Sequence, residues 1–464
     1  MALDDIQSFL QILDREGELH HIKAEVDWDQ EIAAITDRIS KRVDGGPGLR
    51  FHKVKGYRTP VGTNLFGSRR RMQLAMGGMA PDILGKRLVT AIRPESGSTS
   101  LQKLRNFLSR ENFKPRLVDK PPCQAIIFDN NPSVEKYLPA LKTWPADGGR
   151  FLTLPLVITK DPDSGAHNYG LYRVQLKGDN KLAIHWAASS DGARHHELYR
   201  QRLQKNPVAI ALGGAPALMY AASAPVPKGS DEAAFATFLR GESVPMATSL
   251  THGLRVPAGA DFVLEGYIDM EETVVEGPFG NHTGFYDIAQ PAPLFRVHTL
   301  TCRENPVYTC TVVGPPPMED CYMAQYTERL FLPLMQMDYP WIEDVHQPME
   351  GIFHQCTFLS IKKNGPGEGM ERIRQLWSGP WRPRARLLAV FDEGTNLEEG
   401  SGLLWRLLNR VNPETDLLVR GDQVGIDATS KFSSEPGFEG ERKPIKASPS
   451  IQQLLARRWR DYGF

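Results

Sequence analysis

The chain has 464 residues, of which 41% are hydrophobic and 24% charged, a composition typical of a globular protein and a length beyond one hydrophobic core. We therefore expect two or three packed domains. Its 55 basic residues balance 55 acidic ones, so no net field would attract nucleic acid or an anionic membrane, and we expect neither as a partner.

The cysteines and the N-terminal segment indicate a cytoplasmic protein. The five cysteines are odd in number and never spaced as CxxC, which favours reduced thiols over a disulfide framework or a zinc site. The N-terminal residues MALDDIQSFLQ are acidic and amphipathic and lack the basic and apolar regions of a secretion signal. The longest uncharged stretch, residues 206–227, contains glycines and prolines, which favours a buried strand and a loop over a membrane helix.

The first part of the chain, residues 1–115, is predicted to form an α/β domain. Apolar residues recur at helical spacing over residues 3–16 and 30–42, and the pattern over residues 72–113 is mostly helical. Short apolar runs at residues 49–51 and 60–65 indicate strands between these helices.

Prolines and charges in KPRLVDKPP mark the next boundary, so we place a central domain at residues 116–315. Many short β-type segments separated by Gly, Pro and Asp turns predict a sandwich or barrel there. The segments are LPLVITK, LYRVQL, KLAIHW, VAIAL, DFVLEGYI, FRVHTL and VYTCTVV. After a run of prolines, residues 316–464 begin with an expected helix at 320–337 and continue as strands alternating with helices, an α/β signature.

Two polar segments of the central domain have a functional and a structural interpretation each. Arg173 in NYGLYR could hold a carboxylate or phosphate in a bidentate manner, but a surface arginine on a strand is the more common case. His195 and His196 invite a metal interpretation, but neighbouring residues of a helix point to different faces, which favours a solvated pair.

Two further segments carry carboxylates at element boundaries. Asp231 and Glu232 precede an apolar helical run and indicate a helix start; alternatively Glu232 could ligate a hard divalent cation together with the amide oxygen of Asn168. In EGPFGNHTGFY, Glu276 precedes a Gly-Pro turn, where its carboxylate could be held over a ligand. By itself this segment also fits a decorated hairpin loop.

The order of several sequence blocks resembles the UbiD-type decarboxylases, with a layout closest to the 3-polyprenyl-4-hydroxybenzoate decarboxylases of that family. The resemblance extends over nearly the whole chain. The blocks are CQAIIF, HNYGLYRVQL, APVPKGSDEAAFATFLRG, ADFVLEGYI, EGPFGNHTGFY, GPPPMEDCYMA, TERLFLPL and GIDATSKF.

This resemblance implies an α+β multidomain protomer. Its central domain would be a split β-barrel of the flavin-reductase type, flanked by an α/β N-terminal domain and an α/β C-terminal domain with an oligomerisation tail. The family binds prenylated FMN, whose phosphate is held through a divalent metal, commonly Mn²⁺, often with K⁺. A flavin prenyltransferase supplies that cofactor, and dimers and hexamers are common.

The implied activity is reversible, non-oxidative decarboxylation of an aromatic, heteroaromatic or α,β-unsaturated carboxylic acid. By position, Asn168 and Glu232 match the family's metal ligands, and Arg173 and Glu276 match two members of its catalytic trio. The residues that match the cofactor-contacting strips are Leu171, Tyr172, Arg173, His185, Trp186, Ala187, Ser190 and Asp191.

The chain departs from the family pattern at two positions of these blocks. The third catalytic position, normally an acid that donates a proton, is Asn281, and an amide cannot deliver a proton. His282, Glu276 or an ordered water would then have to replace it. A histidine that helps hold the metal is replaced by Ser189, a weaker metal ligand. The alternative to a decarboxylase is therefore a UbiD-like flavin-binding or partner-binding protein without that activity.

Overall fold

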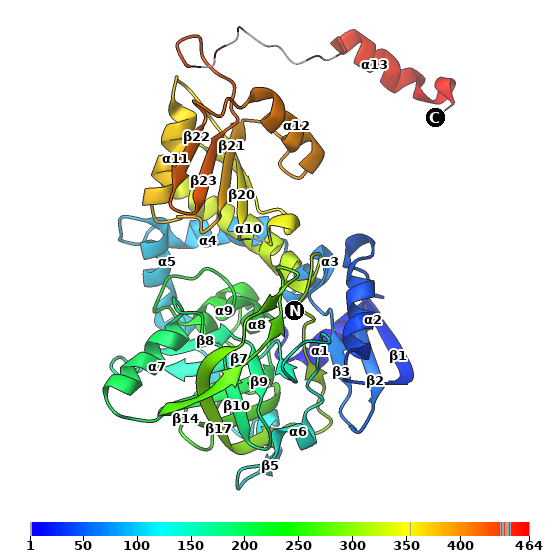
Figure 1. Cartoon of the computed structure of the whole chain (residues 1–464), viewed down its shortest axis with the longest axis vertical. Coiled ribbons are helices and arrows are strands. Elements are labelled where there is room, and N and C mark those ends of the chain that lie inside the picture. The colour runs from blue at the N-terminus through cyan, green and yellow to red at the C-terminus, as the bar shows by residue number, and fades with distance from the viewer. Residues whose placement is uncertain are drawn as a thin grey trace.

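The computed structural model describes residues 2–352, 354–436, 438, 440, 445 and 447–463 and shows three regions along the chain. Figure 1 shows an N-terminal region in blue, a central region built around a large sheet in green, and a C-terminal region in yellow to orange. The mixed α+β multidomain organisation expected from the sequence is confirmed.

The N-terminal region contains the expected helices and strands around a four-stranded sheet with strand order β1-β2-β3-β18. Its last strand is contributed by the end of the central region, so the two regions share this sheet. The elements are α1 (Ile6–Arg15), β1 (Leu19–Val26), α2 (Glu31–Ser40), β2 (Gly48–Val54), β3 (Val61–Thr63), α3 (Arg69–Ala75), α4 (Pro81–Ile92), α5 (Ser100–Leu108) and β18 (Tyr308–Thr309).

Local sequence explains the first helix. Asp5 accepts a hydrogen bond from Ser8 N and so caps α1, and the helix buries Ile6, Phe9 and Leu13.

The centre of the molecule is a nine-stranded sheet in which every strand pairing is antiparallel. It is one curled sheet, a half-barrel, which decides between the sandwich and the barrel that the sequence left open. Its strand order is β6-β9-β10-β17-β14-β11-β7-β8, with β5 paired to β17. The strands are β5 (Ile126–Phe128), β6 (Phe151–Leu152), β7 (Leu156–Lys160), β8 (His167–Leu171), β9 (Val174–Leu176), β10 (Lys181–Ile184), β11 (Asn206–Gly213), β14 (Ala260–Glu276) and β17 (Gln290–Cys302).

The curled sheet encloses a core in which Val208, Ile210, Leu264, Phe295 and Val297 are fully buried. Strands β14 and β17 form its longest pairing, which runs to the pair Glu276 and Gln290. The remaining elements of the region are β4 (Arg116–Leu117), α6 (Val134–Tyr137), α7 (Asp191–Gln201), α8 (Pro216–Ala221), α9 (Glu232–Arg240), β12 (Pro245–Thr248), β13 (Arg255–Pro257), β15 (Phe279–Gly280) and β16 (Tyr286–Asp287).

The C-terminal region begins with the expected long helix, α10 (Glu319–Asp338), whose residues Tyr326, Leu330 and Phe331 pack into one core with the N-terminal helices. A five-stranded sheet of order β19-β20-β21-β23-β22 follows. After α10, the C-terminal region contains β19 (Ile342–His346), β20 (Cys356–Ile361), α11 (Glu368–Ser378), β21 (Leu387–Asp392), α12 (Gly400–Arg410), β22 (Leu417–Arg420), β23 (Gln423–Asp427) and α13 (Pro449–Arg458). Short 3₁₀ turns lie at Val43–Gly45, Glu111–Phe113, Pro122–Gln124, Met349–Gly351 and Trp459–Tyr462.

The cysteines agree with the expectation of reduced thiols. All five are buried and free of disulfides. Burial raises the pKa of Cys123 to about 12, so its thiol stays protonated and unreactive. None of the helices in the described part of the chain is long and apolar enough to cross a membrane.

Candidate active site

The ion pair between Arg173 and Glu276 forms the centre of a polar cluster. Arg173 follows β8 and Glu276 ends β14. The guanidinium binds the carboxylate in a bidentate manner, with Nε 2.9 Å from Oε1 and Nη2 3.0 Å from Oε2. The Nδ1 atom of His185 lies 3.2 Å from the same Oε2 atom, and the Arg173 guanidinium lies 4.7 Å from the ring centre of Phe279. The fold thus brings together three residues that the sequence singled out.

This environment keeps Glu276 ionised. Burial opposes the charge, since the side chain is 0% exposed. Hydrogen bonds with His185 and Arg173 and the positive charge of Arg173 outweigh burial and lower the pKa of Glu276 to about 2. Glu276 therefore serves as a fixed anion that orients the Arg173 guanidinium.

The turn after Glu276 is built by its glycines and by two neighbouring polar side chains. Gly277 has a φ of 90°, which favours glycine, and its N–H donates to Gln175 Oε1 at 2.9 Å. The N–H of Gly280 donates to Asp147 Oδ1 at 2.8 Å. A side chain at Gly148 would approach the carbonyl oxygen of Gly277 to 2.1 Å, so this loop packs directly on the turn. The glycine-rich pattern of EGPFG thus reflects close backbone packing.

Asn281 reaches the cluster only through an acid that the sequence analysis missed. Its Nδ2 atom donates to Asp287 Oδ1 at 2.5 Å, and its Oδ1 atom accepts from Thr283 N at 2.8 Å. Asp287 in turn accepts a hydrogen bond from Arg173 Nη1. The pairing of β15 with β16 sets this contact because it brings the chain back on itself. A hairpin prediction across GNHTG would have placed Asp287 beside the site.

His282 points elsewhere. Its ring packs against that of His354 in the C-terminal region, with ring centroids 5.3 Å apart. The loop that carries Asn281 is therefore linked to the C-terminal region through the histidine that follows it.

A second pair of polar residues is formed by Asn168, which lies in β8, and Glu232, which contacts the backbone of β8. Glu232 is the first residue of α9, and its Oε2 accepts from Tyr169 N at 3.0 Å. Burial raises its pKa to about 8, with the charges of Asp231 and Asp191 adding to the effect. The buried Nδ2 atom of Asn168 makes no hydrogen bond of standard geometry within the described residues. Burial raises the pKa of Tyr172, and a contact with the Asn168 side chain is among those that oppose this rise.

Both interpretations of the Glu232 segment fit this geometry. Asp231 caps α9 by accepting from Ala233 N at 2.9 Å, which confirms the helix start. The start of the helix directs Glu232 into the protein, where burial disfavours its charged form. Rotation of the Asn168 amide by 180° would place its oxygen at the orphaned position. One carboxylate and one amide oxygen suit a hard divalent cation.

Residues between the two pairs form a cradle around the start of α7. The rings of Tyr172 and Trp186 meet edge to face at 4.9 Å. Within the described residues, the buried Nε1 atom of Trp186 is unpartnered. Ser190 caps α7 by accepting from Ala193 N at 3.2 Å. A helix start with polar caps beside an aromatic pair suits a ligand that has a phosphate and a flat ring.

The other sequence-predicted residues lie at the edge of this cradle. Leu171 and Asp191 are half-buried, and Asp191 accepts from Arg194 Nε at 3.2 Å. Ala187 and Ser189 are exposed. No group of three or more His, Cys, Asp or Glu side chains in the described ranges is placed to hold a metal. A cation at Asn168 and Glu232 would thus need further oxygens from a phosphate or water.

The adjacent histidines of α7 differ from the prediction of a solvated pair. His195 is 2% exposed, and its Nδ1 atom lies 2.9 Å from Thr159 Oγ1. The prediction was wrong for His195 because α7 packs against β7 and turns this residue into the interface.

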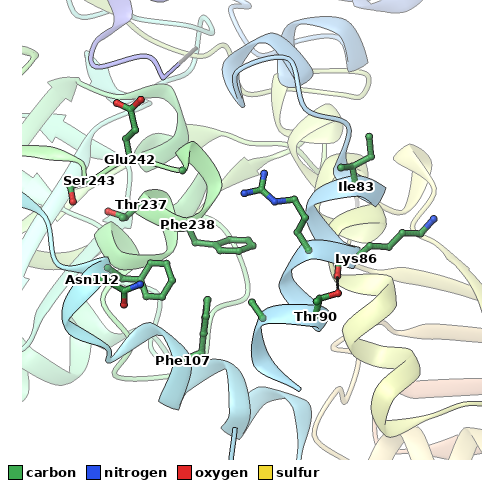
Figure 2. A pocket seen from close by; sticks show the side chains of 13 residues that line it. Ile83, Lys86, Thr90, Phe107, Asn112, Thr237, Phe238, Glu242 and Ser243 are labelled. Carbon is green, nitrogen blue, oxygen red and sulfur yellow. Dashed lines mark hydrogen bonds between the residues drawn. The ribbon is translucent and has the colours of Figure 1, made fainter. Parts of the chain in front are cut away.

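The molecule also has a groove away from both polar pairs. It lies between α4, α5 and α9 and has a volume of about 820 Å³ (Figure 2). The aromatic rings of Phe107, Phe113 and Phe238 contact one another there. Its ionisable lining residues are Lys86, Arg87 and Glu242. The Arg173 cluster has converging charged groups that this groove lacks, and we therefore place the chemistry at the cluster.

Comparison with known proteins assigns all three regions of the chain to one protein family. The chain matches the family models of 3-octaprenyl-4-hydroxybenzoate carboxy-lyase for its N-terminal domain at residues 10–92, its Rift-related domain at 116–316 and its C-terminal domain at 321–445. An uncharacterised protein of Archaeoglobus fulgidus is 38% identical over 95% of this chain and 94% of its own. One of Aquifex aeolicus is 37% identical over 99% and 98%.

Solved structures resemble the chain over its whole length. The UbiD-class enzyme HmfF from Pelotomaculum thermopropionicum, in an evolved dimeric form with prFMN, has a TM-score of 0.80 and 26% identity, covering 98% of this chain and 99% of that one. The vanillic acid decarboxylase of Sedimentibacter hydroxybenzoicus in its closed form has a TM-score of 0.83 and 25% identity, covering 99% of both chains. The chain belongs to the UbiD family of carboxy-lyases.

Proposed function

We propose that this member of the UbiD family catalyses the reversible, non-oxidative decarboxylation of an aromatic, heteroaromatic or α,β-unsaturated carboxylic acid with prenylated FMN. The observation that carries the proposal is the buried, bidentate Arg173–Glu276 ion pair, together with a second buried carboxyl at Glu232 whose charge is disfavoured by burial. The first arrangement suits recognition of a carboxylate, and the second suits a cation that bridges to a phosphate.

The chain's own residues have separable roles in this proposal. Arg173 orients the substrate carboxylate, and Glu276 holds the guanidinium in place. Asn168 and Glu232 would hold Mn²⁺ or another divalent cation, and this cation would supply positive charge for the flavin phosphate. Tyr172 and Trp186 pack beside the cofactor. Prenylated FMN supplies an electrophilic ring that accepts the electron pair left when carbon dioxide departs.

The family assignment adds the finer points of the proposal. The curled sheet would be the split barrel of the flavin-reductase type, and K⁺ would accompany the divalent metal. A flavin prenyltransferase would supply the cofactor. The protein would act in the cytoplasm as a homo-oligomer, a dimer or hexamer, and the dimeric form reported for HmfF is consistent with this.

The test is co-expression of the chain with a flavin prenyltransferase, followed by an ultraviolet-visible spectrum and mass analysis of the bound cofactor. Purified protein is then incubated in D₂O with benzene, furan and styrene, and with benzoic, furan-2-carboxylic and cinnamic acids. We expect bound prenylated FMN, and deuterium exchange or decarboxylation with at least one class of probe.

Asn281 supports a second candidate, a flavin-binding protein without decarboxylase activity, because the usual proton donor is missing at this position. Protein that binds unmodified FMN, or prenylated FMN without turnover of any probe, would favour this second function.

A further inference from the structure

We propose that Asp287 is the proton-donating acid of this site, in the place of the acid that Asn281 replaces. The proposal rests on the decarboxylase function above and adds a catalytic residue to it. Asp287 lies outside the EGPFGNHTG block that carries the resemblance, six positions beyond Asn281 in the chain.

The geometry places Asp287 in the reacting cluster. Its Oδ2 atom accepts from Arg173 Nη1, and its Oδ1 atom accepts from Asn281 Nδ2 at 2.5 Å. Arg173 thus contacts two carboxylates, Glu276 through Nε and Nη2 and Asp287 through Nη1. Arg173, Glu276 and Asp287 thus form an arrangement of one guanidinium and two acids. The second acid, Asp287, lies on β16, the returning strand of the hairpin.

The two acids differ in their access to solvent. Glu276 is 0% exposed, and both of its oxygens are engaged by Arg173, so it cannot readily exchange a proton with water. The side chain of Asp287 is 37% exposed. A proton donor must be recharged after each turnover, and only Asp287 of the two has direct access to water for this purpose.

The amide at position 281 fits this assignment. Asn281 donates to Asp287 and accepts from Thr283 N and Oγ1, so both ends of its amide are used. An ionised acid at position 281 would place two carboxylates within hydrogen-bond distance, where like charges repel. An amide at position 281 avoids this repulsion, and through its hydrogen bond Asn281 positions the carboxyl group of Asp287.

Exposed apolar residues flank Asp287 in the chain. Phe285 is 76% exposed, Tyr286 44% and Ile288 87%. Exposed apolar residues next to an ionised cluster are typical of a surface that binds an apolar ligand with a charged end. An aromatic or unsaturated acid has these properties.

The proposed step balances as follows. The substrate carboxylate contacts the Arg173 guanidinium beside Asp287, which carries a proton taken from water. The bond between the carboxyl carbon and the rest of the substrate breaks, carbon dioxide leaves, and the electron pair of that bond, which bound prenylated FMN would hold, stays available to the substrate carbon. A new C–H bond forms with the proton of Asp287, which becomes a carboxylate. Water then returns a proton to Asp287.

The experiment compares Asp287→Asn, Asn281→Asp/Asp287→Asn and Glu272→Gln with the wild-type holoenzyme. Glu272 is a matched control because it pairs with an arginine, Arg296, on the same hairpin at 44% exposure but outside the cluster. Deuterium exchange with the probes above, prenylated FMN content and thermal stability are measured for each. Loss of a general acid costs about 10²- to 10⁴-fold in rate, so Asp287→Asn should lose that much with unchanged cofactor content.

The double variant separates proton donation from a structural role. It restores an acid at the family position and leaves an amide at position 287, so it should regain most of the exchange rate lost by Asp287→Asn. A purely structural role for Asp287 predicts no such recovery. Exchange by Asp287→Asn at the wild-type rate, or a folded double variant that stays as inactive as Asp287→Asn, overturns the proposal.

A second measurement does not depend on activity. In cofactor-free protein labelled with ¹⁵N-asparagine, the side-chain amide resonance of Asn281 is identified by its loss in Asn281→Asp. It should shift with pH in wild type as Asp287 titrates, and not in Asp287→Asn. A pH-independent resonance in wild type overturns the role of Asp287. An inactive wild-type holoenzyme whose resonance does shift overturns the proposed function alone.

Discussion

Two buried glutamates, Glu276 and Glu232, are in opposite electrostatic situations. Glu276 accepts a bidentate ion pair from Arg173, and its pKa is lowered to about 2. Glu232 accepts one backbone hydrogen bond, and burial raises its pKa to about 8. The same residue type at similar burial is thus saturated in one cluster and uncompensated in the other. Partners, rather than burial, set the charge state.

This difference shows which part of the site is formed by protein residues alone and which part would need a bound cation. The Arg173 cluster is preformed, because every charge in it meets an opposite charge from the protein. The Asn168–Glu232 pair contains a buried carboxyl whose charged form is disfavoured by burial, and a bound cation would offset that cost. Catalysis would depend on the first cluster and cofactor retention on the second.

The largest expected effect is on catalysis. Glu276→Gln removes the anion that orients Arg173 and should lower the exchange rate by about 10²- to 10⁴-fold. The prenylated FMN content should stay close to that of wild type, because the metal-binding pair is untouched. Exchange kinetics and cofactor content per protein are measured together. A wild-type rate in Glu276→Gln would remove the role assigned to this residue.

The next effect is on stability as a function of pH. The folded-state pKa of Glu276 is lowered from 4.5 to about 2, so its contribution is present above pH 4.5 and is lost as the pH falls toward 2. The advantage of wild type over Glu276→Gln in unfolding free energy should therefore shrink by about 3 kcal/mol across this range. Urea unfolding of both cofactor-free proteins at several pH values measures it. A difference that does not depend on pH would contradict the ion pair.

A change at the Asn168–Glu232 pair should affect retention of the flavin more than the stability of the fold. Asn168→Leu removes a buried amide whose Nδ2 atom makes no hydrogen bond of standard geometry but whose side chain contacts the Tyr172 hydroxyl, so the unfolding free energy of the cofactor-free protein should change by less than about 1 kcal/mol. The same change should abolish Mn²⁺-dependent retention of the flavin. Thermal unfolding and flavin content after gel filtration give the two readouts. Loss of stability together with intact flavin retention would show that Asn168 serves the fold rather than a metal.

The smallest effect is expected at an ion pair outside both clusters. Glu272 pairs with Arg296, and the side chains are 44% and 35% exposed. Glu272→Gln should change the unfolding free energy by less than about 1 kcal/mol and leave exchange unchanged. An effect as large as that of Glu276→Gln would mean that the hairpin as a whole, and not the buried pair, determines activity.

The sequence by itself determined the elements and the chemical types at the site. Helical spacing located α1, α2 and α10, and β-type segments located the strands of the central sheet, because these signals are local. Positions in matching blocks identified Arg173 and Glu276, which the fold brings into contact across 103 residues. The nature of each polar side chain could be read directly from the chain.

Only the tertiary structure decided which polar groups meet. The register of β15 on β16 joins Asp287 to Asn281 and Arg173. The sequence had suggested His282, Glu276 or an ordered water as the proton donor, and the ring of His282 packs on His354. The packing of α7 on β7 likewise buries His195, which the sequence left in solvent. Strand register and helix packing depend on contacts distant in the chain. The partners of a side chain, and with them its charge and role, therefore follow from the fold.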